Sequence, residues 1–181
     1  GNGQFILEEK LAIEFENGLS NEAKYLSEKL SELTGVKFST HEGVSNNQGI
    51  VLKLAKMEVN GKRDEAYKLD VNQNGVVLTG SDPAGVFYGV QSLLALLGND
   101  AYLNQKLPLS LPYINIADSP RFGFRSLHMD VARNFQTKET IKRTLDIMSH
   151  YKLNHFLFYT TEDEGWRLEI PGLPELTEVG G

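Results

Sequence analysis

Cysteine is absent from this chain of 181 residues. Its absence excludes a disulfide framework, a thiolate nucleophile and a cysteine-ligated metal site. No apolar run approaches the roughly 18 residues that a membrane-spanning helix requires, so we expect no membrane span. Basic residues are also few, since 18 Lys and Arg stand against 24 Asp and Glu for a net charge of -6. Because the basic residues form no run, we expect no nucleic acid partner.

The motifs of several enzyme classes are missing as well. The chain has no Gly-x-Ser-x-Gly turn, no phosphate-binding glycine loop and no dinucleotide fingerprint. Its four histidines, at positions 41, 128, 150 and 155, show no metal-ligand spacing, so a zinc site is not expected. What is present, 40% hydrophobic and 23% charged residues, is typical of a folded globular protein with one domain and part of another.

The first 115 residues show the periodicities of an α+β domain. Helices are predicted at residues 21–35 and 84–97, and the second has apolar groups on more than one face, which indicates burial on two sides. Strands are predicted at residues 11–15, 49–54, 66–71 and 76–79. The last two are joined through Asn74-Gly75, a strong hairpin signal. We predict a small antiparallel-sheet domain with two helices.

Residues 116–181 have a different pattern. A strand at 124–130, a helix at 137–151 and a strand at 155–159 predict a parallel βαβ unit. One such unit cannot close a core, so we expect the chain to stop inside a domain. The apolar strand residues Leu127, Met129, Phe156 and Phe158 should then lack neighbours. We expect dimerisation or local disorder after residue 120 to follow.

Charged residues follow both strands of this second region. Asp130 and Arg133 come after the first strand, and the acidic triplet 162–164 comes after the second. Functional residues of parallel α/β folds gather at the carboxyl ends of strands, and a guanidinium suits bidentate bonds to carboxylates or sugar hydroxyls. The alternative is an Asp130–Arg133 pair beside a solvated acidic loop. Trp166 is either a sugar-stacking platform or, more commonly for a lone Trp, a loop anchor.

Three motifs occur in one order: residues 124–135 (FRSLHMDVARNF), 151–154 (YKLN) and 161–170 (TEDEGWRLEI). Together they closely resemble the start of the catalytic barrel of glycoside hydrolase family 20, the β-N-acetylhexosaminidases. Residues 171–180 (PGLPELTEVG) resemble the bacterial chitobiase branch. Residues 84–94 (AGVFYGVQSLL) resemble the last helix of the small α/β domain that precedes this barrel.

The resemblance implies an α/β domain of the hexosaminidase type at residues 1–115 and a truncated (β/α)8 barrel at 116–181. It implies removal of terminal N-acetylglucosamine or N-acetylgalactosamine from β-N-acetylhexosaminide glycans by substrate-assisted hydrolysis, without metal or organic cofactor. A barrel takes about 250 residues, so the family's catalytic Asp-Glu pair is expected beyond Gly181 and the fragment is expected to be inactive. Such work fits a periplasmic or extracellular location, and the chain shows no signal peptide.

Three residues match functional positions of the family. Arg133 matches the arginine that binds hydroxyls of the terminal sugar. Glu162 matches the first Asp of an Asp-Asp pair, which supports the catalytic Glu through a histidine, and Asp163 matches the second. The resemblance therefore implies a substrate-binding role for Arg133 and supporting catalytic roles for the two acids.

Four residues depart from the family pattern. Glu162 is one methylene longer than the family's Asp, Asn134 replaces a His, and Leu157 and Tyr159 stand where a His-x-His pair is common. These changes alter the polar groups around the sugar. They leave open an alternative, a non-catalytic carbohydrate-binding or scaffolding relative.

Overall fold

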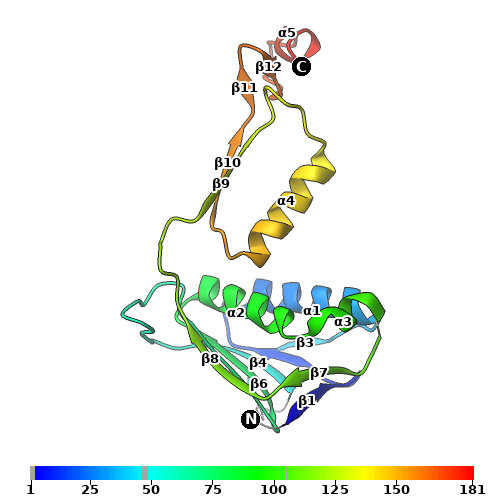
Figure 1. Ribbon diagram of the computed structural model, residues 1–181, viewed down its shortest axis with the longest axis vertical. Coiled ribbons are helices and arrows are strands. Elements are labelled where there is room, and N and C mark those ends of the chain that lie inside the picture. Colours follow the sequence, from blue (N-terminus) through cyan, green and yellow to red (C-terminus); the bar gives the residue numbers. More distant parts are fainter. Residues whose placement is uncertain (1–2, 46–48, 105) are drawn as a thin grey trace. The chain divides into compact units, whose positions relative to one another are not determined.

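The computed structural model describes residues 3–45, 49–104 and 106–181. The chain folds as two compact units, Gly1–Arg121 and Phe122–Gly181 (Figure 1). None of the helices in these described ranges is long and apolar enough to cross a membrane.

A six-stranded sheet forms the base of the first unit. Its strand order is β3-β2-β4-β6-β5-β8. The strands are β2 (Ile13–Phe15), β3 (Thr40–Glu42), β4 (Gly49–Leu54), β5 (Tyr67–Asn72), β6 (Gly75–Gly80) and β8 (Ile114–Asp118). β2 pairs in parallel with β3 and β4, and β4 in parallel with β6, whereas β5 pairs antiparallel with β6 and β8.

The predicted antiparallel sheet is therefore wrong, and the sheet is mixed. The β5–β6 hairpin forms at Asn74-Gly75 as predicted, and it is antiparallel because a tight turn reverses the chain. β2 and β3 are instead joined through a helix, a crossover that brings the chain back in the same direction. Crossover pairings depend on distant partners, so strand periodicity alone does not reveal their direction.

Two long helices cover one face of this sheet (Figure 1). Helix α1 (Ser20–Thr34) buries Ala23, Leu26, Leu30 and Leu33, the apolar positions at helical spacing, and ends at Gly35 in a left-handed conformation, with φ at 74°. Helix α2 (Pro83–Ala95) begins at Asp82, whose side chain accepts a hydrogen bond of 2.7 Å from the Gly85 amide. A short helix α3 (Gly98–Asn104) follows, which the sequence did not predict.

Two glycines bring α2 against the sheet. A Cβ at Gly89 would lie 2.2 Å from Leu78 Cδ1, and one at Gly85 would lie 2.4 Å from the Ala66 carbonyl oxygen. No side chain fits at these distances. The helix axis therefore lies closer to β5 and β6 than an alanine would allow, and Val86, Val90 and Leu93 enter the core.

A second, two-stranded sheet completes the first unit. β1 (Gln4–Leu7) pairs antiparallel with β7 (Leu109–Pro112) and contributes Leu7 to the same core. Neither strand was predicted from the sequence. β8 runs across residues 115–116, where the domain boundary was expected, and the first unit extends to Arg121.

The second unit holds the predicted parallel strand–helix–strand arrangement. β9 (Ser126–Asp130), α4 (Lys138–His150) and β10 (His155–Tyr159) follow one another, and the two strands pair in parallel. Thr137 caps α4 by accepting a hydrogen bond of 3.2 Å from the Thr140 amide. A small hairpin of β11 (Thr161–Glu162) and β12 (Gly165–Trp166) and a short helix α5 (Glu175–Glu178) end the chain.

The apolar strand residues of this unit are poorly covered. Leu127 and Phe158 are 37% and 42% exposed, and Met129 and Phe156 are half-buried. Phe156 and Phe158 stack on each other with ring centroids 5.5 Å apart. Dimerisation of this chain and local disorder after residue 120 stay predictions.

Candidate functional site

Two parallel strands of the second unit end side by side. Asp130, the last residue of β9, lies opposite Tyr159, the last residue of β10. His128 lies two residues before Asp130 and therefore on the same face of the strands. Its ring meets the Tyr159 ring edge-on, with centroids 5.9 Å apart. This face therefore carries polar groups at the carboxyl ends of the strands, whereas the opposite face carries Met129 and Phe158.

Arg133 lies at the centre of this group. Its backbone amide donates to Asp130 Oδ1 at 3.0 Å, which fixes the turn after β9. Its guanidinium then meets three carboxylates: Nη1 lies 3.4 Å from Asp130 Oδ2, Nη2 lies 3.0 Å from Glu162 Oε2, and Nε lies 3.5 Å from Glu164 Oε2. The Asp130–Arg133 pair considered from the sequence is present, and two acids of the triplet, Glu162 and Glu164, also contact Arg133.

Glu162 is the best-anchored acid of the triplet. Tyr159 Oη and Arg133 Nη2 both donate to its Oε2, and the Asp163 amide donates to its Oε1 at 3.4 Å. These donors, Tyr159 above all, lower the pKa of Glu162 from 4.5 to about 2. Glu162 is therefore ionised at any ordinary pH. The same hydrogen bond raises the pKa of Tyr159, which stays a protonated donor.

The other two acids of the triplet lie next to this carboxylate. Oxygen atoms of Glu162, Asp163 and Glu164 lie within 4.8 Å of one another. The hydrogen bond and the charge of Asp163 raise the pKa of Glu164. Arg133 supplies positive charge to the cluster, and Glu162 raises the pKa of Arg133 in return. The site is acidic overall, with a half-exposed guanidinium at its centre.

Trp166 behaves as an anchor of the loop. Its indole Nε1 donates to the Leu168 carbonyl at 2.6 Å, and its backbone amide donates to the Gly180 carbonyl at 2.6 Å. The indole bond holds the side chain against the following residues, and the amide bond ties the hairpin to Gly180. These contacts support the interpretation of Trp166 as a loop anchor.

Arg167 is a structural residue that sequence reasoning missed. Its Nε and Nη2 donate to the carbonyls of Val131 and Ala132, each at 3.0 Å. These bonds fasten the β11–β12 hairpin to the segment that carries Arg133. Gly165 allows the hairpin to approach this segment closely, since a Cβ there would lie 2.4 Å from the Ala132 carbonyl oxygen. The acidic triplet is therefore held near Arg133 from two directions.

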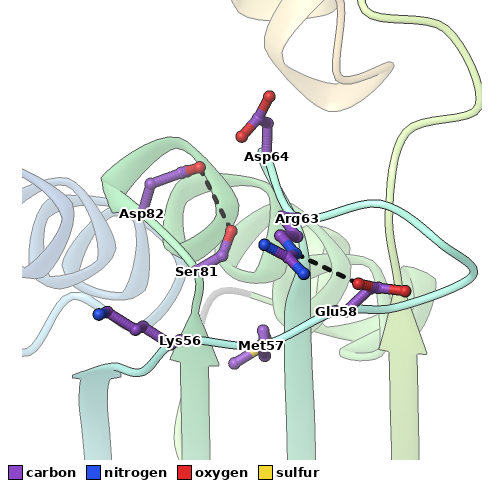
Figure 2. Close-up of a pocket in the computed structure, with 7 residues that line it drawn as sticks. All are labelled: Lys56, Met57, Glu58, Arg63, Asp64, Ser81 and Asp82. Atoms are coloured by element: carbon purple, nitrogen blue, oxygen red, sulfur yellow. Dashed lines mark hydrogen bonds and ion pairs between the residues drawn. The ribbon is translucent and has the colours of Figure 1, made fainter.

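A separate hollow of about 590 Å³ lies on the first unit. Figure 2 shows its lining, in which Arg63 pairs with Glu58 at 3.2 Å and Ser81 donates to Asp82 at 3.2 Å. Asp82 also caps α2 and accepts a bond from the Glu65 amide. The polar groups that interact here serve local structure, so the strand ends of the second unit remain the stronger candidate site.

Comparisons with known proteins divide the chain at nearly the same place as its two compact units. Residues 122–181 match the glycosyl hydrolase family 20 catalytic domain, and residues 1–119 match domain 2 of the same family. A β-hexosaminidase of Vibrio vulnificus is 46% identical over 140 residues, which is 76% of this chain and 16% of that protein. The N,N'-diacetylchitobiase of Vibrio harveyi is 49% identical over 115 residues, 64% of this chain and 12% of that protein.

Solved structures show the same likeness. A family 20 exo-β-N-acetylglucosaminidase from Vibrio harveyi, in complex with N-acetylglucosamine, matches with a TM-score of 0.84 and 32% identity over 99% of this chain and 27% of that one. The β-N-acetylhexosaminidase of Streptomyces coelicolor matches with a TM-score of 0.81 and 30% identity, over 100% of this chain and 36% of that one. The chain thus spans between about a tenth and a third of the length of these relatives. The chain belongs to glycosyl hydrolase family 20, with residues 1–119 matching its domain 2 and residues 122–181 its catalytic domain.

Proposed function

We propose that this chain is a fragment of a β-N-acetylhexosaminidase: domain 2 followed by the first strand, helix and strand of a (β/α)8 barrel. The full-length parent removes terminal N-acetylglucosamine or N-acetylgalactosamine from glycans, in the periplasm or outside the cell. One observation carries the proposal. In a chain of this family, Arg133 lies at the carboxyl ends of two parallel strands and is oriented there by three carboxylates.

The geometry of Arg133 suits a sugar-binding role. Each of its three ion pairs involves a different guanidinium nitrogen. Each Nη atom carries a second hydrogen. The side chain is 57% exposed, so those hydrogens can reach ligand hydroxyls. A planar donor fork with fixed orientation is well suited to two neighbouring hydroxyls of one sugar ring.

The supporting acids are assigned roles by position. Glu162 is ionised and held in place, and it contributes negative charge near the catalytic acid that the rest of the barrel supplies. Asp163 adds a second negative charge beside it. Hydrolysis itself uses the substrate's own N-acetyl oxygen as nucleophile, with a Glu as general acid and then base. A closed barrel has eight strands, and the second unit supplies β9 and β10. We therefore place the catalytic Asp-Glu pair in the remainder of the barrel and expect the fragment to be inactive.

Hydrolysis of chromogenic β-N-acetylglucosaminide and β-N-acetylgalactosaminide tests the proposal. The fragment and the protein from the complete reading frame are assayed side by side. We expect turnover by the full-length protein alone. Turnover by the fragment would contradict the placement of the acid/base, and turnover by neither would contradict the enzyme.

A second function is favoured by the four departures from the family pattern. Asn134, Leu157, Tyr159 and Glu162 all lie at or beside the strand ends, and together they replace the polar groups expected there. A parent without catalytic activity that still binds N-acetylglucosamine would be a carbohydrate-binding relative. Calorimetric titration of an inactive full-length protein with that sugar distinguishes this function from loss of all binding.

A further inference from the structure

Tyr159 contacts both members of the Arg133–Glu162 ion pair. Its hydroxyl donates to Glu162 Oε2, the same oxygen that Arg133 Nη2 contacts at 3.0 Å. Its ring lies beneath the guanidinium, with the Arg133 Cζ atom 5.6 Å from the ring centroid. The His128 ring packs edge-on against it. The tyrosine is therefore fixed by a neighbouring strand on one side and touches two charged side chains on the other.

The length of the Glu162 side chain favours such a contact. A glutamate side chain has one more rotatable bond than an aspartate, and holding it in one rotamer costs more conformational entropy. Arg133 has a long side chain as well. An ion pair between two mobile side chains contributes little unless other groups fix its geometry. The Tyr159 hydroxyl supplies a third, charge-assisted contact from a half-buried ring on a strand.

We propose that Tyr159 is a positioning residue for sugar binding: it fixes the Glu162 carboxylate and supports the guanidinium face, and thereby orients Arg133 toward hydroxyls of the terminal sugar. The inference rests on the proposed function of Arg133. Two positions that depart from the family pattern thus form one hydrogen-bonded unit. The longer acid reaches the tyrosine hydroxyl, and the tyrosine replaces a histidine with a different donor.

Steady-state kinetics of the full-length protein test this role. Tyr159→Phe keeps the ring and removes the hydroxyl. We expect KM to rise about tenfold, the size of one lost hydrogen bond to a charged group, while kcat changes less than about twofold. Tyr113→Phe, which removes a hydroxyl from the first unit, is the matched control and should leave both constants unchanged. An unchanged KM in Tyr159→Phe would overturn the proposal.

A second comparison separates positioning from general loss of structure. The experiment measures kcat/KM of wild type and of Tyr159→Phe on substrates whose terminal sugar lacks one ring hydroxyl. If Tyr159 orients Arg133, the variant should be less sensitive than wild type to loss of the hydroxyl that Arg133 binds. Equal sensitivity to every deoxy substrate would contradict a positioning role.

A double-mutant cycle tests whether Tyr159 acts through Glu162. Once Glu162→Ala has removed the acceptor, adding Tyr159→Phe should raise KM no further. If the two substitutions raise KM by independent factors that multiply, Tyr159 does not act through Glu162. If Tyr159→Phe does not fold, Tyr159→His carries the test, because its ring keeps an N–H donor: a KM near that of wild type supports the proposal, and a KM as high as that of Glu162→Ala overturns it.

Failure of the proposed function has a different signature. A wild-type protein that turns over no hexosaminide and binds no N-acetylglucosamine overturns both the function and this inference. An active wild type with an unaffected Tyr159→Phe variant overturns the inference alone.

Discussion

The two units of the chain differ in how completely they bury their apolar side chains. In the first unit the central strands bury Ile50, Leu69 and Leu78 completely. In the second unit, Phe158 on β10 and Leu145 on α4 are 42% and 45% exposed. Burial of apolar area is worth about 25 cal/mol per Å². The first unit therefore closes its own core, whereas the second leaves apolar side chains of its strands and helix exposed to solvent.

The largest expected effect is at Phe158, and it depends on the length of the chain. In the fragment, Phe158→Ala should lower the free energy of unfolding by less than about 1 kcal/mol, because the ring is already partly exposed. In the full-length protein we expect about 3–5 kcal/mol, the usual loss for a buried Phe. Urea unfolding of both proteins measures the difference. Equal losses in the two would show that the rest of the barrel does not cover this face.

Leu69 should behave in the opposite way. It is completely buried in the centre of the first unit, so Leu69→Ala should cost about 2–5 kcal/mol in either protein. The midpoint of chemical denaturation of the first unit is the measurement. A loss below about 1 kcal/mol in the fragment would contradict a core that this unit closes alone.

Two glycines, one in each unit, sharpen the same comparison. Gly89→Ala places a methyl group 2.2 Å from Leu78 Cδ1, and overpacking of this kind costs about 1–3 kcal/mol. Gly123→Ala, at the start of the second unit, meets no atom within 4 Å and should change stability by less than about 0.5 kcal/mol. Thermal unfolding of the two variants measures both effects. A neutral Gly89→Ala would mean that the overpacking cost is no larger than the roughly 1 kcal/mol that alanine gains over glycine inside a helix.

The smallest expected effect is the pH dependence of Glu162. Its pKa in the folded protein, about 2, lies below the ordinary 4.5, so the carboxylate contributes stability above pH 4.5 that is lost as pH falls through 2. Glu162→Gln lacks this contribution. Wild type should therefore exceed the variant in urea midpoint at pH 6, and the gap should close toward pH 2. A gap that does not depend on pH would argue against the Tyr159 and Arg133 contacts.

Local signals explain what the sequence predicts correctly about the fold. The β5–β6 hairpin follows from Asn74-Gly75, and α1 follows from apolar residues at helical spacing. The parallel pairing of β2 with β4 does not follow, because it joins segments separated by a whole helix. β1 and β7 pair across about a hundred residues and are four residues long each, too short for a periodicity to identify.

The candidate site divides in the same way. The rule that functional residues follow parallel strands predicts Arg133 and Glu162 at the same edge of the sheet, and the structure places Arg133 Nη2 3.0 Å from Glu162 Oε2. Tyr159 was identified only as a departure from a pattern, since its contact with Glu162 depends on side-chain direction. The bonds of Arg167 to the backbone of Val131 and Ala132 span the length of the βαβ unit, and residue type alone does not indicate carbonyl partners.

The most direct test of the account is the specificity constant of full-length Arg133→Lys on a chromogenic β-N-acetylglucosaminide. Lysine keeps the charge but loses the planar fork that three carboxylates orient. We predict a fall in kcat/KM of about a hundredfold, with Lys106→Arg in the first unit unchanged as a control. A specificity constant within about twofold of wild type would contradict the assignment of Arg133 to the terminal sugar.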